Sequence, residues 1–168
     1  MAVRLLPRTL PELYAHAIVL ERDATKRFQV FAHCMREAGF EHLAEEFDAI
    51  GKEEREQYEL LAEGTRNANL PQISPWEYAW HYMGPDADVV PEPRSARDLL
   101  ALALSAERRT QTFYADVAEG VEDDAVSAFA AEMAADESRH IERLERLIAR
   151  EPEPAASGED DIDVASIR

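Results

Sequence analysis

Cysteine is nearly absent from this sequence, since its 168 residues include only Cys34. A single thiol excludes an internal disulfide framework and any Cys-x-x-Cys metal site. Long hydrophobic runs are also missing, and the longest fall far short of the roughly 18 residues of a membrane span. Residues 1–14 lack the apolar stretch of a signal peptide. We therefore expect a cytoplasmic protein with no membrane partner.

Basic residues are few. Lys and Arg number 18 against 35 Asp and Glu, which gives a net charge of −17. This charge argues against nucleic acid and anionic membranes as partners and favours cations or basic partners. Hydrophobic residues make up 46% of the chain, which is too many for a disordered protein. The length suits about one domain with a proper core.

Glycine and proline divide the chain into four long helical segments. A capping box opens the first, which covers residues 9–39, and the second covers about 41–64. The third covers 95–120 and the fourth about 123–150. Short, long and short connections between four helices predict an all-α four-helix bundle with a long crossover between helices two and three. We place this domain at residues 1–150.

Residues 65–95 form the crossover, which must travel the length of the bundle so that the second and third helices lie parallel. It contains one short helix candidate that starts at Ser74 and ends at Gly84. Its aromatic side chains are expected to cap the bundle or to form a subunit contact. Residues 151–168 read as a flexible acidic tail.

Polar residues interrupt the apolar seam of every helical segment. In the fourth segment, steps of four and three residues pass through Met133 and Leu144, and between them they fall on Glu137 and His140. Each of these seam positions faces the bundle interior, so every long helix turns one Glu inward near its middle. The same count in the first three segments finds Glu21, Glu54 with Gln57, and Glu107.

Four carboxylates in one core require compensation. Each buried ion costs several kcal/mol, and like charges raise that cost. Either the carboxyl groups are protonated, as in a metal-free scaffold, or cations hold them together. Two divalent ions balance four carboxylates, and such a donor set on four helices is typical of di-iron and di-manganese bundles. Oxygen-rich ligation without thiolate suits iron or manganese better than structural zinc.

We therefore predict a centre of two iron ions, with manganese as the alternative metal. Gln57 has two open interpretations: its amide oxygen ligates weakly, or its amide bonds a ligand carboxylate. Tyr114 is expected to pack in the core. The predicted ligands, which also carry the chemistry, are Glu21, Glu54, Glu107, Glu137 and His140.

The two halves of the chain repeat each other. Glu54-Arg-Glu-Gln57 corresponds to Glu137-Ser-Arg-His140, and the spacing from Glu21 to Glu54 nearly equals that from Glu107 to Glu137. The pattern predicts two related helical hairpins that meet about a pseudo-twofold axis, with the metal ions between them.

Residues 10–150 resemble the rubrerythrin-type branch of the ferritin-like superfamily, whose ligand pattern falls on the five positions above. Gln57 stands where rubrerythrins have His, and Thr110 stands where they have a further Glu. Their Cys-rich rubredoxin domain is missing. These departures weaken a peroxidase assignment and move the expectation toward ferritins, whose oxidation centres also have one His. We therefore expect a ferroxidase, as a homo-oligomer, that oxidises Fe(II) with O2 or H2O2 for iron storage or protection against oxidative stress. Peroxide reduction by the same centre is the alternative activity.

The last seven residues, 162–168, follow an acidic linker but restore apolar side chains at Ile162, Val164 and Ile167. They resemble the C-terminal targeting peptide of encapsulin cargo proteins, with Ala165 in place of a Gly. This resemblance implies that the three apolar residues bind an encapsulin shell protein and that the protein resides inside that compartment.

Overall fold

The computed structural model describes residues 6–74 and 95–152 and forms four helices from them. These are α1 (Leu10–Glu37), α2 (Glu41–Gly64), α4 (Ala96–Gly120) and α5 (Asp124–Arg150). The predicted all-α, ferritin-like four-helix bundle is confirmed. The short helix expected after Ser74, the aromatic crossover and the tail lie outside the described residues.

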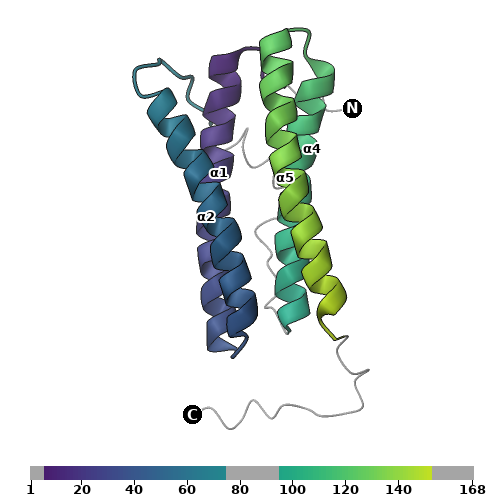
Figure 1. Cartoon of the computed structure of the whole chain (residues 1–168). Helices are drawn as coiled ribbons and strands as arrows, with labels where there is room; N and C mark the ends of the chain where they lie inside the picture. Colours follow the sequence, from purple (N-terminus) through teal and green to yellow (C-terminus); the bar gives the residue numbers. More distant parts are fainter. Residues whose placement is uncertain (1–5, 75–94, 153–168) are drawn as a thin grey trace.

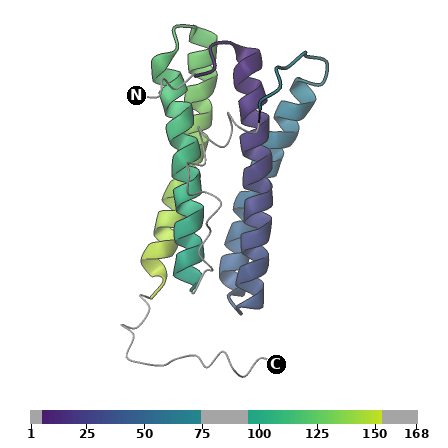
Figure 2. The same ribbon diagram turned by 180° about the vertical axis from the view of Figure 1, so that it is seen from behind.

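The helices pair as two hairpins that lie side by side, α1 with α2 and α4 with α5 (Figures 1 and 2). Following the colours of Figure 1 along the chain, α2 and α4 run in the same direction, as the long crossover predicts. Helices α1 and α5 run in the opposite direction. None of the described helices is both long and apolar enough to cross a bilayer.

Local signals position the first hairpin. Thr9 caps α1 by accepting a hydrogen bond from the amide of Glu12, whose side chain accepts one from the amide of Thr9. At the other end Gly39 has φ +82° and lets the chain reverse. The amide of Gly39 donates to the carbonyl of Arg36, and the amide of Phe40 donates to that of Met35. This glycine-dependent turn directs the chain into α2.

The core consists of two apolar clusters with a polar layer between them. One cluster includes Phe28, Phe47, Leu100 and Leu144. The other includes Leu13, Leu61, Val117 and Val126, on the same four helices. Along each helix the buried polar residues lie between its contributions to the two clusters. These polar residues are Glu21, Thr25, Glu54, Glu107, Thr110, Glu137 and His140.

Helices α1 and α2 approach each other closely at Gly51. A β-carbon added there would lie 3.0 Å from the Cβ of Phe28. Gly51 is buried and stands one helical turn before Glu54. Because glycine has no side chain, α1 and α2 can approach each other closely beside the polar layer.

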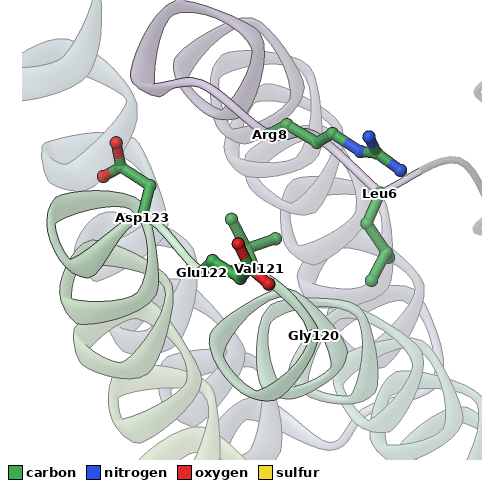
Figure 3. Close-up of a pocket in the computed structure, with 6 residues that line it drawn as sticks. All are labelled: Leu6, Arg8, Gly120, Val121, Glu122 and Asp123. Carbon is green, nitrogen blue, oxygen red and sulfur yellow. The ribbon is translucent and has the colours of Figure 1, made fainter.

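A hollow lies at the end of the bundle where α4 turns into α5 (Figure 3). Its two carboxylates, on Glu122 and Asp123, are exposed, and Asp123 accepts hydrogen bonds from the first amides of α5. This hollow is therefore distinct from the buried polar layer. Its lining residues are Leu6, Arg8, Gly120, Val121, Glu122 and Asp123.

Candidate metal centre

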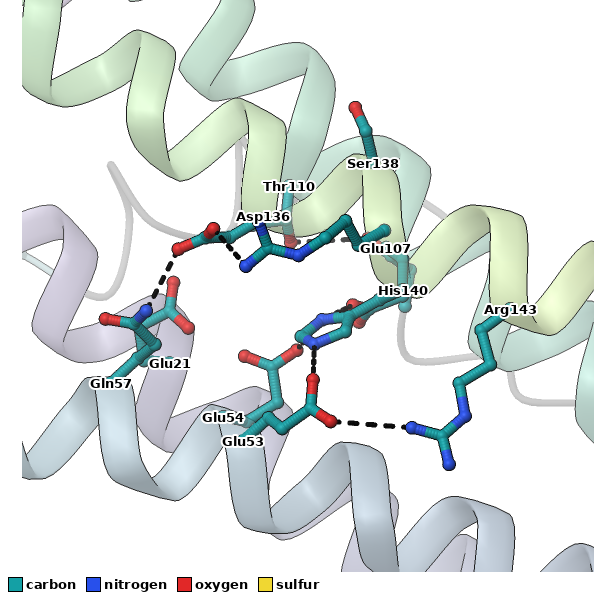
Figure 4. Close-up of polar contacts among 12 residues, drawn as sticks. Glu21, Glu53, Glu54, Gln57, Glu107, Thr110, Asp136, Ser138, His140 and Arg143 are labelled. Carbon is teal, nitrogen blue, oxygen red and sulfur yellow. Dashed lines mark hydrogen bonds and ion pairs between the residues drawn. The ribbon is translucent and has the colours of Figure 1, made fainter.

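The structure places all five predicted ligands inside the bundle, and Figure 4 shows the neighbourhood of four of them. Each helix contributes one Glu, and α5 adds His140 one turn after its Glu. The exposed fractions are 1% for Glu21, 1% for Glu54, 0% for Glu107, 2% for Glu137 and 6% for His140.

Four of the five form a compact quartet. Glu54, Glu107, Glu137 and His140 each present a ligand atom, and these atoms lie within 4.8 Å of one another. The Nδ1 of His140 lies 2.8 Å from Oε1 of Glu54 and 3.4 Å from Oε2 of Glu107. Nitrogen and oxygen ligands of one transition-metal ion lie at about 2.0–2.2 Å from it, so atoms this close together can share an ion.

Most of these atoms lack a hydrogen-bond partner within the described part of the chain. They are both carboxylate oxygens of Glu54 and of Glu107, Oε2 of Glu137 and Nδ1 of His140. Nδ1 of His140 makes the ion-pair contacts with Glu54 and Glu107 given above. Because buried polar atoms are nearly always hydrogen-bonded, convergent atoms without partners fit a site for a cation. The chemistry of the donors fits iron or manganese.

Glu21 lies beside the quartet and has a different partner. Its Oε1 accepts a hydrogen bond of 2.8 Å from the hydroxyl of Tyr114, which is fully buried. Tyr114 packs in the apolar core, as expected, and it also orients a predicted ligand. The corresponding position of the first hairpin is Phe28, which has no hydroxyl to donate.

Gln57 is half-buried, and its Nε2 donates a 2.9 Å hydrogen bond to Oδ2 of Asp136. This contact runs to a residue outside the predicted ligand set. Asp136 also accepts a hydrogen bond from Arg139 at 2.5 Å. Since Nε2 is engaged, Oε1 remains as the acceptor atom of the Gln57 amide. Figure 4 shows the Gln57 amide on α2 joined to Asp136.

Burial and mutual repulsion raise the pKa values of three carboxyl groups in the cluster. Burial, followed by the charge of Glu54, raises the pKa of Glu21 well above the ordinary value. Burial and the charge of Glu107 do the same to the pKa of Glu137. Burial and the charge of Glu54 also raise the pKa of Glu107. Without a cation, burial and mutual repulsion therefore favour the protonated forms of these three carboxyl groups.

Glu54 and His140 stabilise each other's charged forms. Burial raises the pKa of Glu54, but contact with His140 outweighs it and lowers the pKa overall. Burial disfavours the charged imidazole, yet Glu107 and Glu54 raise the pKa of His140 to about 11. The metal-free site therefore contains an imidazolium among carboxylates. A metal ion that binds Nδ1 must displace its proton.

Two charged residues near the site were not predicted from the sequence. The buried Nη1 of Arg27 lies 3.9 Å from Oε1 of Glu107, and Oε2 of Glu53 lies 2.9 Å from Nε2 of His140. Neither residue occupies a seam position, so helical periodicity gave no reason to select it.

Comparison with known families supports this description of the centre. The family model for rubrerythrin matches residues 12–148. The chain belongs to the rubrerythrin family. Rubrerythrins are oxidoreductase-type proteins that typically bind a di-iron centre. Family membership and the buried carboxylate–histidine cluster together indicate that this rubrerythrin-family chain is a di-iron protein.

A solved structure has the same fold. The 2.00 Å crystal structure of an uncharacterized conserved protein from Magnetospirillum magnetotacticum MS-1 is similar to this rubrerythrin-family chain with a TM-score of 0.77 and 26% identity. The similarity covers 89% of this chain and 99% of the other. The search of curated proteins finds no match.

Proposed function

We propose that this rubrerythrin-family protein is a ferroxidase, which oxidises Fe(II) at the buried carboxylate cluster with O2 or H2O2 as the electron acceptor. The observation that supports the proposal is the convergence of buried donor atoms without partners on Glu54, Glu107, Glu137 and His140. Glu21 completes the set, held by Tyr114.

The five residues have distinct roles in binding the iron substrate. Glu54, Glu107, Glu137 and His140, whose ligand atoms converge, would hold Fe(II), and Glu21 would supply a further carboxylate beside them. Four carboxylates balance the charge of two divalent ions, which removes the repulsion that raises the pKa of Glu21 and Glu137 in the metal-free cluster.

Two Fe(II) ions supply two electrons, which reduce O2 with two protons to H2O2, or H2O2 with two protons to two water molecules. The protein contributes ligand geometry, charge balance and the exclusion of water. The apolar clusters on both sides of the polar layer provide this exclusion.

Peroxide reduction is the alternative activity of the same centre. Gln57 and Thr110 replace two positions of the rubrerythrin ligand pattern. The buried Thr110 hydroxyl donates to the carbonyl of Ala106 at 3.3 Å and belongs to the helix backbone network. A donor set with one imidazole is closer to that of ferritin oxidation centres, which favours iron oxidation as the physiological reaction.

Ligand removal tests this function. Glu54→Ala and Glu137→Ala should each abolish stoichiometric Fe(II) binding and reduce Fe(II) oxidation to the uncatalysed rate. Iron is measured after anaerobic loading, and oxidation is followed by ultraviolet absorbance with O2 and then with H2O2. Glu56→Ala is the matched control, because Glu56 is exposed on the same helix and pairs with Lys52. Wild-type oxidation rates in both ligand variants would contradict the proposal, and a wild-type protein that binds no iron would favour the metal-free scaffold.

We further propose that residues 162–168 target the protein to an encapsulin shell, which would then be the place of iron storage. The support is the sequence pattern of Ile162, Val164 and Ile167 after an acidic linker. Extended apolar residues of this spacing suit small pockets on a partner surface.

A further inference from the structure

We infer that Glu53 is a positioning residue for His140 and that Arg143 holds Glu53 in place for this role. The inference rests on the proposed metal site. The imidazole of His140 lies between two carboxylate environments. Its Nδ1 faces Glu54 and Glu107, and its Nε2 lies 2.9 Å from Oε2 of Glu53 (Figure 4).

This contact affects which nitrogen of the His140 imidazole holds the proton. A neutral imidazole carries one N–H and one lone pair, and either nitrogen can hold the proton. The Oε2 of Glu53, 2.9 Å from Nε2, is placed to accept a hydrogen bond from an Nε2–H, which favours the tautomer with its proton on Nε2. The lone pair of Nδ1 then points at the buried donors of Glu54 and Glu107. Glu53 thereby selects the tautomer that can ligate a metal ion.

Arg143 gives Glu53 a fixed orientation. Its Nη1 lies 3.5 Å from Oε1 of Glu53, so the two oxygens of this carboxylate contact different partners. The Nε and Nη2 atoms of Arg143 each lie 2.7 Å from Oε2 of Glu46. Glu46 and Glu53 are two turns apart on α2, while His140 and Arg143 are one turn apart on α5. The four side chains therefore form one connected row across the α2–α5 face.

Glu53 needs this support because it lies at the surface. Its side chain is 51% exposed, and a free surface carboxylate samples several rotamers. Contact with both Arg143 and His140 limits this freedom. Its Oε2 faces the ring nitrogen remote from the quartet, so Glu53 acts through His140 and does not belong to the ligand set.

Cobalt binding to the full-length protein tests this role, with Co²⁺ as the probe. Glu53→Ala should weaken Co²⁺ binding by about 10- to 100-fold, the usual effect of removing such a partner of a metal-bound His. Glu53→Gln, whose amide oxygen still accepts from Nε2–H, should recover most of that loss. Glu56→Ala should bind like wild type, and circular dichroism of the metal-free variants verifies folding. Affinity is measured by calorimetry.

A second readout separates positioning from general structure. Proton NMR of the Co²⁺-loaded protein should show a shifted, solvent-exchangeable resonance from the Nε2–H of His140. Glu53→Ala should broaden or remove it through faster exchange, and Glu53→Gln should restore it. Wild-type affinity together with an unchanged resonance in Glu53→Ala would overturn the role of Glu53 and leave the metal site intact. Failure of the wild type to bind Co²⁺ would overturn the metal site and this role with it.

Discussion

At the level of single residues, the centre consists of ionisable side chains whose charged forms are disfavoured by burial. Burial raises the pKa of Glu21 and Glu137 well above the ordinary range, while His140 lowers that of Glu54. Burial therefore favours the protonated forms of Glu21 and Glu137 in the metal-free protein, where the loaded protein would hold cations. Stability and metal binding consequently oppose each other at these positions.

Glu137→Gln should reveal this opposition. Because the folded-state pKa of Glu137 is raised, its carboxyl contributes stability that is present below the ordinary pKa of 4.5 and lost as pH rises through the folded-state value. Gln is neutral throughout and of similar shape. The variant should match the metal-free wild type near pH 4.5 and exceed it progressively at higher pH, by up to about 1.4 kcal/mol per pH unit.

Urea denaturation of chelator-treated protein between pH 4.5 and 8 measures this difference. Glu56→Gln is the control, since that exposed side chain should show no comparable pH dependence. A Glu137→Gln variant less stable than wild type at pH 8 would refute the expected sign.

Gln57→His addresses the asymmetry between the two halves of the centre. Gln57 corresponds to His140 in the internal repeat and contacts Asp136, just as His140 contacts Glu53. An imidazole at position 57 can donate to Asp136 through one nitrogen and ligate through the other. Because imidazole ligates iron more strongly than a neutral amide, the second metal ion should bind more tightly and leave more slowly after oxidation.

Anaerobic Fe(II) titration and chelator-capture kinetics measure both quantities for Gln57→His. Gln57→Ala is the companion variant, which removes the amide without adding a ligand. Unchanged second-site affinity and release in Gln57→His would limit Gln57 to its hydrogen bond with Asp136.

At the scale of helices, tight pairing within each hairpin brings the ligands to the same level. Gly51 is a close approach of this kind within the first hairpin, because a β-carbon there would meet the Cβ of Phe28 at 3.0 Å. Phe28 is fully buried, and the contacted atom is fixed to the backbone. Helices α1 and α2 cannot accommodate an added group here without separating.

Gly51→Ala and Gly64→Ala form a matched pair that tests this packing. Both replacements gain up to about 1 kcal/mol of helix propensity. At Gly64 a β-carbon meets nothing within 4 Å, so this variant should be at least as stable as wild type. At Gly51 overpacking costs about 1–3 kcal/mol, so this variant should be the less stable of the two. Thermal and urea denaturation measure the order, and equal stabilisation of both would show that the core yields at Gly51.

At the scale of the whole molecule, two hairpins enclose one polar layer. Apolar clusters lie on either side of the layer, and polar side chains join the hairpins across the α2–α5 face. The net charge of −17 favours the approach of cations such as Fe(II). The proposed encapsulin shell would be a partner of the whole molecule.

Deletion of residues 159–168 should leave helicity and iron oxidation unchanged and abolish co-purification with a co-expressed encapsulin shell. A short peptide orders at an entropic cost, so each tail should bind modestly, and many tails within one shell should retain the cargo together. Triple replacement of Ile162, Val164 and Ile167 by Ser tests the apolar contacts without shortening the chain. Encapsulation of the truncated protein, or exclusion of the full-length protein, would disprove targeting.

Local sequence signals were enough to predict the four helices and the five buried ligand candidates. Capping at Thr9, the glycine turn at Gly39 and the apolar seams are local features, and each depends on neighbours within a few residues. The long crossover likewise implied the parallel direction of α2 and α4. Seam counting selected five buried polar residues because helical periodicity alone decides which face a side chain occupies.

Which of these residues meet depends on how the helices pack against one another. The quartet excludes Glu21, Tyr114 on α4 bonds Glu21 on α1, and Glu53 on α2 reaches His140 on α5. Such contacts depend on the distance and rotation between hairpins and on the rotamer of each side chain. Periodicity along one helix contains none of this information, because it describes a face and not the atoms that another helix brings against it.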